Sequence, residues 1–189
     1  FDLIYELGAN AVRLSHYQQN ETVYEICDKM GLIVICEVPY ITMHINNSES
    51  EDNIVNQLYE MIKQNFNHPS VALWGVMNEV STYVESEKEI KLASKLYNCS
   101  KSLDPSRQVY GANVFLTPFN STLNQLTDVV GYNLYGGWYV GDVSGNKWQI
   151  EEIKKVKNNR PLMLTEYGAE AILKYHSDDP INHDYTEEY

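Results

Sequence analysis

Short apolar runs alternate with amphipathic stretches along the whole chain. The apolar runs have the length and composition of buried strands and lie at 10–14, 32–38, 71–77, 109–114, 129–134 and 162–165. Helical spacing of apolar residues marks 1–7, 20–30, 85–103 and 148–156, and a further helix that carries Ile54, Leu58, Met61 and Ile62. Polar residues dominate 40–50, and 118–126 has the composition of a loop with a short helix. This alternation predicts a parallel sheet with helices outside it.

Residues that terminate secondary structure support these boundaries. Asn20 is a preferred N-cap residue, and Gly8 and Gly31 stand where helices commonly end. Pro69 and Pro105 follow two of the helical segments, and proline cannot continue a helix. The predicted strands and helices are therefore separate elements.

The ends of the predicted strands distinguish between two parallel architectures. A doubly wound nucleotide-binding sheet would carry a Gly-x-Gly-x-x-Gly turn after its first strand, and the sequence has neither that turn nor a Walker motif. In a (β/α)8 barrel, functional groups gather at the C-terminal ends of the strands. Polar residues stand at these ends throughout, at 13–17, 37, 78–79, 113, 133–135 and 165–167. We therefore predict an α/β fold of the TIM barrel type.

Composition narrows the range of partners. The formal net charge of −12 disfavours nucleic acid and anionic membranes, because both attract basic surfaces. No run of about 18 apolar residues is present, so the sequence predicts no membrane span. The 15 tyrosines indicate either a sugar- or protein-binding surface or a general compositional bias. A neutral substrate that needs no electrostatic steering fits this charge.

The cysteines and the chain length indicate the setting of the domain. Cys27, Cys36 and Cys99 form an odd and sparse set, which does not suggest a disulfide framework. We expect reduced thiols, which give no strong sign of export and favour a cytoplasmic location. The 189 residues fall short of the roughly 250 of a complete barrel, and both ends interrupt amphipathic patterns. We therefore expect a single partial barrel domain over residues 1–189.

Two carboxylates are the strongest candidates for catalysis. Glu79 follows the buried strand at 71–77, and Glu166 follows the strand at 162–165 in the same manner. Three βα units separate them, so a closed barrel would place them nearly opposite each other across its mouth. Carboxylates about 5–5.5 Å apart can hydrolyse a glycosidic bond with retention, one as acid and then base, the other as nucleophile. The alternative for Glu79 is a surface position in the first turn of a helix.

Arg13 and two histidines are candidates for supporting roles. Arg13 ends the first strand and should point inward, where it could hold a nucleophilic carboxylate ionised or pair structurally with Glu37. His16 and His44 could bond sugar hydroxyls or join Glu37 as metal ligands. No close spacing such as His-x-His or His-Glu-x-x-His supports a metal site, and we assign no metal ligand.

The loop NLYGGWY brings three aromatic residues to the end of the fifth predicted strand. Tyr135, Trp138 and Tyr139 would lie over the barrel mouth, where their rings could stack on a sugar. The glycine pair between them would let the backbone turn close to a ligand. The alternative is a rim in which the rings, Trp138 in particular, pack for stability.

Four segments together resemble the central domain of glycoside hydrolase family 2, the β-galactosidase and β-glucuronidase family. They are NAVRLSHY (10–17), NHPSVALWGVMNE (67–79), DVVGYNLYGGWY (128–139) and RPLMLTEYGAEA (160–171), and they follow the family's order over nearly the whole chain. The resemblance implies that Glu79 is the acid/base and that Glu166 is the nucleophile.

The resemblance also implies roles for the neighbouring residues. Asn78 would bond the 2-hydroxyl of the sugar, and His16 would touch the sugar. Tyr135 would donate a hydrogen bond to the nucleophile, and Arg13 would support it. Asn133 and Trp138 complete the set that we expect to bind substrate.

The same resemblance numbers the visible strands as barrel strands two to seven. The first and last strands and the flanking β-sandwich domains would then belong to a longer parent chain, which could form a homo-oligomer. No organic cofactor is implied, although a Mg²⁺ or Na⁺ ion could serve the parent enzyme. Gln18 stands where the family usually has proline, and Gly136 replaces a common aromatic residue. An open barrel exposes two strand edges, so we expect this segment alone to be poorly active and to self-associate.

The substrate that the resemblance favours is a terminal β-D-galactoside, because the segments 67–79 and 128–139 look closer to galactosidases. Two alternatives stay open. The parent could cleave glucuronides or other β-glycosides by the same mechanism, or the segment could be an inactive barrel fragment.

Overall fold

A computed structural model describes residues 1–42, 47–81, 85–156 and 159–189 of the chain. The helices are α1 (Asp2–Glu6), α2 (Glu21–Met30), α3 (Ser48–Asn65), α4 (Glu87–Leu103), α5 (Ser144–Val156) and the 3₁₀ turn η1 (Leu123–Gln125). The strands are β1 (Ala11–Leu14), β2 (Ile33–Glu37), β3 (Val71–Asn78), β4 (Gln108–Val114), β5 (Val129–Leu134) and β6 (Leu162–Tyr167). All six predicted strands are present, with bounds within two residues of those expected.

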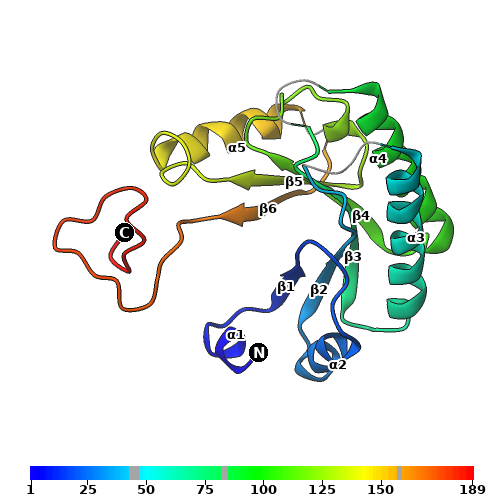
Figure 1. Cartoon of the computed structure of the whole chain (residues 1–189), viewed down its shortest axis with the longest axis horizontal. Coiled ribbons are helices and arrows are strands. Elements are labelled where there is room, and N and C mark those ends of the chain that lie inside the picture. The colour runs from blue at the N-terminus through cyan, green and yellow to red at the C-terminus, as the bar shows by residue number, and fades with distance from the viewer. Residues whose placement is uncertain (43–46, 82–84, 157–158) are drawn as a thin grey trace.

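The strands form one parallel sheet in which every strand pairs with its neighbours in sequence, in the order β1-β2-β3-β4-β5-β6. Figure 1 shows the sheet curling, with α3, α4 and α5 covering its convex side. After β6, residues 168–189 contain neither helix nor strand and extend beyond the sheet (Figure 1). The predicted α/β architecture of the TIM barrel type is confirmed, as a curled part of such a barrel.

Polar caps decide where the helices begin. Asn20 accepts a hydrogen bond from the backbone N–H of Thr22 at 2.9 Å, and Gly31 ends α2 with φ +70°, as predicted. Helix α3 begins inside the stretch predicted to be a loop, because the Asn47 side chain caps its first turn. At α4, Ser86 and Glu89 form a reciprocal capping box. Helix α5 starts four residues earlier than its apolar spacing indicated.

The main core lies between the convex side of the sheet and helices α2, α3 and α4. Leu58 of α3, Trp74 of β3 and Leu96 of α4 are completely buried there. The continuous apolar runs of β2 and β3 follow from this arrangement, because both faces of each strand are covered. Packing on this side holds the strands in register, so their polar C-terminal ends meet at one rim.

A buried carboxylate connects several elements at the end of the core that lies away from the C-terminal ends of the strands. Asp104, which is fully buried, accepts hydrogen bonds from Trp74 Nε1 at 3.0 Å and from Arg107 Nη1 at 2.7 Å. Arg107 also donates to the backbone carbonyls of Phe66 and Val71, which joins the end of α3 to the start of β3. Burial alone would raise the pKa of Asp104, but hydrogen bonds from Ser106, Arg107 and Trp74 hold it below its usual range.

Replacing this carboxylate should destabilise the fold. In Asp104→Ala the buried Trp74 Nε1 loses its acceptor and Arg107 loses its counter-ion, so we expect the free energy of unfolding at pH 7 to fall by about 3 kcal/mol. Urea titration followed by tryptophan fluorescence measures this change. The exposed Asp178→Ala is the matched control and should stay within about 0.5 kcal/mol of the unaltered protein.

The pH dependence gives a second readout of the same interaction. Because the folded-state pKa of Asp104 is depressed, its stabilising contribution is present above the unfolded pKa of about 3.9 and is lost as the pH falls below it. The stability difference between Asp104→Ala and the unaltered protein should therefore narrow below about pH 4. A difference that persists unchanged at pH 2 would contradict this account.

Candidate active site

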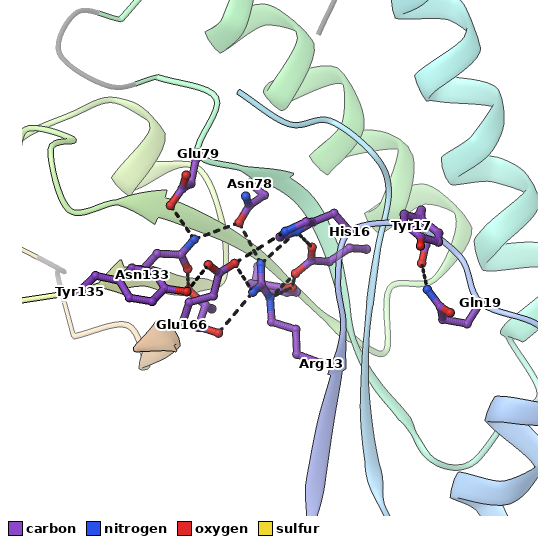
Figure 2. Close-up of polar contacts among 12 residues, drawn as sticks. Arg13, His16, Tyr17, Gln19, Asn78, Glu79, Asn133, Tyr135 and Glu166 are labelled. Carbon is purple, nitrogen blue, oxygen red and sulfur yellow. Dashed lines mark hydrogen bonds and ion pairs between the residues drawn. The ribbon is translucent and has the colours of Figure 1, made fainter. Parts of the chain in front are cut away.

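The two edge strands of the sheet meet through one side chain. Strands β1 and β6 are separated by four others, so in a flat sheet they would lie about 24 Å apart. Yet Arg13 Nη1 of β1 donates to Glu166 Oε1 of β6 at 2.5 Å (Figure 2). This contact is possible only because the sheet curls, and it gathers the C-terminal ends of the strands around a common centre.

Arg13 also contacts the buried interior of this rim. Its Nε donates to Glu37 Oε1 and, at 3.2 Å, to the Tyr110 hydroxyl, which itself donates to Glu37. Burial opposes the charge of the guanidinium, but Tyr110, Glu37 and Glu166 outweigh it and raise the pKa of Arg13. The two roles considered for Arg13, a partner of Glu37 and a support for Glu166, are thus both present.

Gly75 in β3 leaves space for the side chains of Glu37 and Tyr110, which Arg13 contacts. A Cβ atom on Gly75 would lie 2.6 Å from the Tyr110 ring and 2.7 Å from the Glu37 side chain. Both side chains are almost completely buried, Glu37 at 2% exposure and Tyr110 at 0%. The glycine within a strand is therefore a sequence signal of close approach, and it could have pointed to these two residues, which the predicted site left out.

His16 lies between the two carboxylates that Arg13 contacts. Its Nδ1 is 2.9 Å from Glu37 Oε2, and its Nε2 is 3.8 Å from Glu166 Oε1 (Figure 2). Arg13 Nη2 lies 3.4 Å from the same Nδ1, so the tautomer decides whether this nitrogen donates to Glu37 or accepts from Arg13. The ring is 30% exposed, which leaves it accessible from the rim.

Glu79 stands directly after β3 in a backbone conformation that side chains rarely adopt, with φ +53°. Its Oε1 accepts a hydrogen bond from Asn133 Nδ2 at 2.8 Å. Burial and the nearby charge of Glu166 raise its pKa, while the hydrogen bond from Asn133 and the positive Arg13 lower it, and the net direction is upward. A carboxyl with a raised pKa holds its proton closer to neutrality, which suits a general acid.

Asn78 connects the two halves of the site. Its Oδ1 accepts from Arg13 Nη2 at 2.8 Å and from Asn133 Nδ2 at 3.2 Å. These donors orient the amide, so the Nδ2 group points away from both of them (Figure 2). A continuous chain of hydrogen bonds thus runs from Glu79 through Asn133, Asn78 and Arg13 to Glu166.

Glu166 receives a second donor from the loop after β5. The Tyr135 hydroxyl donates to Glu166 Oε2 at 2.9 Å, and the Tyr139 ring stands edge-on to Tyr135 with 4.9 Å between the centroids. Burial and the adjacent Glu166 raise the pKa of Tyr135, so the hydroxyl keeps its hydrogen. Arg13 and Tyr135 together give Glu166 two donors, one on each carboxyl oxygen, and these donors fix its orientation.

Two of the predicted substrate-binding residues, Trp138 and Asn133, are buried in the structure. Trp138 is 1% exposed and packs edge-on against His183 and Tyr185 of the C-terminal segment, with 4.5 Å and 5.1 Å between ring centroids. Its ring is therefore covered by residues distant in sequence and is not presented at the rim. Asn133 is fully buried, and its amide is engaged by Glu79, Asn78 and Thr165.

The structure thus brings together most of the predicted set at the ends of four strands, β1, β3, β5 and β6. Its members are Arg13, His16, Asn78, Glu79, Asn133, Tyr135 and Glu166. Tyr110 was not singled out from the sequence, and Glu37 and Thr165 were noted there as polar strand-end residues but not included in the catalytic and substrate-binding set. Within the described ranges, no group of three or more His, Cys, Asp or Glu side chains is arranged to hold a metal ion. His44 lies outside the described residues.

The three cysteines are free thiols in the structure, as the sequence predicted. Among the helices that the structure describes, none combines the length and the apolar character needed to cross a bilayer.

Comparison with known proteins places this geometry in a family. The family model described as "Glycosyl hydrolases family 2, TIM barrel domain" matches residues 1–184. A β-glucuronidase of Chlorocebus aethiops is 33% identical over the whole chain, which spans 30% of that protein. The chain therefore covers about a third of the length of such relatives.

Solved structures agree with this assignment. An FMN-binding β-glucuronidase from Facaelibacterium prausnitzii L2-6 superposes with a TM-score of 0.92 at 35% identity, covering 99% of this chain and 29% of that one. A putative β-galactosidase from Bacteroides fragilis superposes with a TM-score of 0.83 at 34% identity, covering 95% of this chain and 26% of that one. On the strength of the family match over residues 1–184, the chain belongs to glycosyl hydrolase family 2 and represents its TIM barrel domain.

Proposed function

We propose that the protein is a retaining β-glycosidase in which Glu166 is the nucleophile and Glu79 is the acid/base. The observation that carries the proposal is the contrast between the two carboxyl environments. Glu166 accepts hydrogen bonds from Arg13 and Tyr135, which fix the positions of both its oxygens, whereas burial raises the pKa of Glu79. A carboxyl held in place by two donors suits a nucleophile, and a carboxyl with a raised pKa suits a general acid.

The proposed reaction has two steps. Glu79 gives its proton to the glycosidic oxygen while Glu166 attacks the anomeric carbon, so the bond to the leaving group breaks and a glycosyl ester forms. Glu79, now ionised, then takes a proton from water, which attacks the anomeric carbon and releases Glu166. The charge of Glu166 contributes to the raised pKa of Glu79, so the two carboxyls lie close enough to interact, and a retaining mechanism needs such a nearby pair.

Sugar contacts are proposed for the polar groups that the network leaves available. Two donors already occupy Asn78 Oδ1, and no described residue accepts from its Nδ2, so this amide hydrogen can bond the 2-hydroxyl. His16 is oriented by Glu37 and partly exposed, so its Nε2 side can reach a sugar hydroxyl. An amide N–H donates to a sugar hydroxyl, and an imidazole nitrogen either donates to it or accepts from it.

For the sugar itself we propose β-glucuronides first and the β-galactosides favoured by the sequence second. The names of most matched relatives support the glucuronide, and one matched structure named as a putative β-galactosidase supports the galactoside. The one cation within the hydrogen-bonded network described above, Arg13, is already shared by Glu37 and Glu166. A uronate carboxylate would therefore need a cation from outside this network.

A panel of nitrophenyl β-glycosides tests the choice of sugar. With the protein as its natural host produces it, we expect the kcat/KM for the glucuronide to exceed those for the galactoside, glucoside and mannoside by about 100-fold or more, because a site built for a polar group rejects analogues that lack it. A galactoside preference would favour the second candidate. Turnover of none of the four would support the non-catalytic alternative.

Amide variants of the two carboxyls test the assigned roles. Glu166→Gln removes the nucleophile, so hydrolysis should fall by about 1000-fold or more for every leaving group. Glu79→Gln removes the proton donor, so the loss should be large for a methyl glycoside and much smaller for a dinitrophenyl glycoside, whose leaving group needs no proton.

The control for these variants is Glu25→Gln, a half-exposed glutamate on α2. It should keep the kcat/KM of the unaltered protein for both leaving groups. If Glu166→Gln instead retained activity on the dinitrophenyl substrate while Glu79→Gln lost it, the two roles would be reversed.

A further inference from the structure

Asn133 occupies the centre of the site without reaching its surface. The residue lies on β5 and is 0% exposed, and both ends of its amide are engaged. Its Nδ2 donates to Glu79 Oε1 at 2.8 Å and to Asn78 Oδ1 at 3.2 Å, and its Oδ1 accepts from Thr165 Oγ1 at 2.5 Å (Figure 2). A sugar cannot contact this amide while the network is intact.

The direction of every hydrogen bond in this network follows from Arg13. A guanidinium only donates, so the Asn78 atom that faces it must be the oxygen. That oxygen can only accept, so the Asn133 atom that faces it must be the nitrogen. The Asn133 oxygen is then turned toward Thr165, whose hydroxyl must donate. The amide of Asn133 is therefore locked in one orientation by groups on β1, β3 and β6.

We infer that Asn133 is a positioning residue for the acid/base Glu79, and that Thr165 holds Asn133 in its working orientation. This inference rests on the proposed function, because it assigns the purpose of Asn133 through the role of Glu79. In this orientation the Asn133 amide presents an N–H to Glu79 Oε1, and the other carboxyl oxygen of Glu79 is left for the substrate. Thr165 immediately precedes Glu166, so the strand that carries the nucleophile also orients the donor to the acid/base.

The N–H donor acts against the desolvation of Glu79. Burial raises the pKa of this carboxyl, and the hydrogen bond from Asn133 lowers it. Without the donor the pKa of Glu79 should rise further. A general acid must be protonated, so activity falls as the pH rises through that pKa, and a higher pKa moves this falling limb to higher pH.

Leaving-group dependence separates this role from direct sugar binding. If Asn133 contacted the sugar, its loss would reduce the hydrolysis of all glycosides of that sugar equally. If it acts through Glu79, the loss should be greatest where proton donation matters most. The comparison therefore needs one sugar with two aglycones, a methyl group and a dinitrophenyl group.

The first test is Asn133→Ala in the protein as its natural host produces it. We expect kcat/KM for the methyl glycoside to drop by about 10- to 100-fold, the scale of a lost hydrogen bond to a charged group. The dinitrophenyl glycoside should lose at least several-fold less. The falling limb of the plot of kcat/KM against pH should move to higher pH. For the dinitrophenyl substrate, kcat/KM at low pH should stay unchanged.

Thr165 variants keep the inference testable if Asn133→Ala folds poorly. Thr165→Val preserves the shape but removes the hydroxyl that holds the amide, so it should shift the pH limb in the same direction and by less. Thr165→Ser restores the hydroxyl and should return the limb toward its original position. Thr127→Val is the control, because it also removes a threonine hydroxyl that is hydrogen-bonded within the protein. Thr127 is buried, and its hydroxyl donates to the Val129 carbonyl at the far end of β5. It should lower stability and leave the pH limb in place.

The possible results are distinct. Equal losses for both aglycones, with an unmoved pH limb in Asn133→Ala and Thr165→Val, would overturn the inference while leaving the proposed function intact. A protein in which Glu79→Gln shows no leaving-group dependence would overturn the proposed function, and the inference with it.

Discussion

The contact between Arg13 and Glu166 is the constraint on which the rest of the site depends. It joins the two edge strands of the sheet, so it requires the curvature that brings the strand ends together. The same guanidinium compensates the charge of the buried Glu37, which would otherwise be costly to desolvate. Because a guanidinium cannot accept a hydrogen bond, it also sets the donor and acceptor directions of the amides around it. One side chain therefore links fold, charge balance and hydrogen-bond polarity.

The strands and the exposed members of the site were predictable, because their signals are local. Buried parallel strands appear as continuous apolar runs, and polar residues at their ends mark the rim of a barrel. The sequence marked Glu37 and Thr165 only as polar residues near strand ends, and it gave no sign of Tyr110 inside the strand at 109–114. In strands covered on both faces, the apolar pattern does not tell inward positions from outward ones, so inward polar residues within such strands have no periodic signal. Only the space left by Gly75 hints at two of them.

Trp138 illustrates a different limit. Its loop composition suits a sugar-stacking platform as well as a packed rim, and both alternatives were open from the sequence. The outcome depends on residues 183–189, which fold back onto the ring from more than forty positions away. Tertiary contacts of this kind override local composition, since burying an indole removes a large apolar surface from water. The burial of Asn133 likewise has no local sequence signal, because its partners come from two other strands.

Most hydrogen bonds of the site are made between protein side chains, and this limits which residues can select the sugar. Arg13, Glu37 and Tyr110 bond one another, and Asn133 bonds Asn78, Glu79 and Thr165. In the proposed reaction these residues would shape the chemistry at the anomeric carbon and carry little information about the rest of the sugar. That chemistry is common to all retaining β-glycosidases. Relatives named for different sugars match this chain about equally well, at 35% and 34% identity, as expected if the shared segment supplies the reaction. Recognition of one sugar over another must then come from groups that the network leaves unengaged.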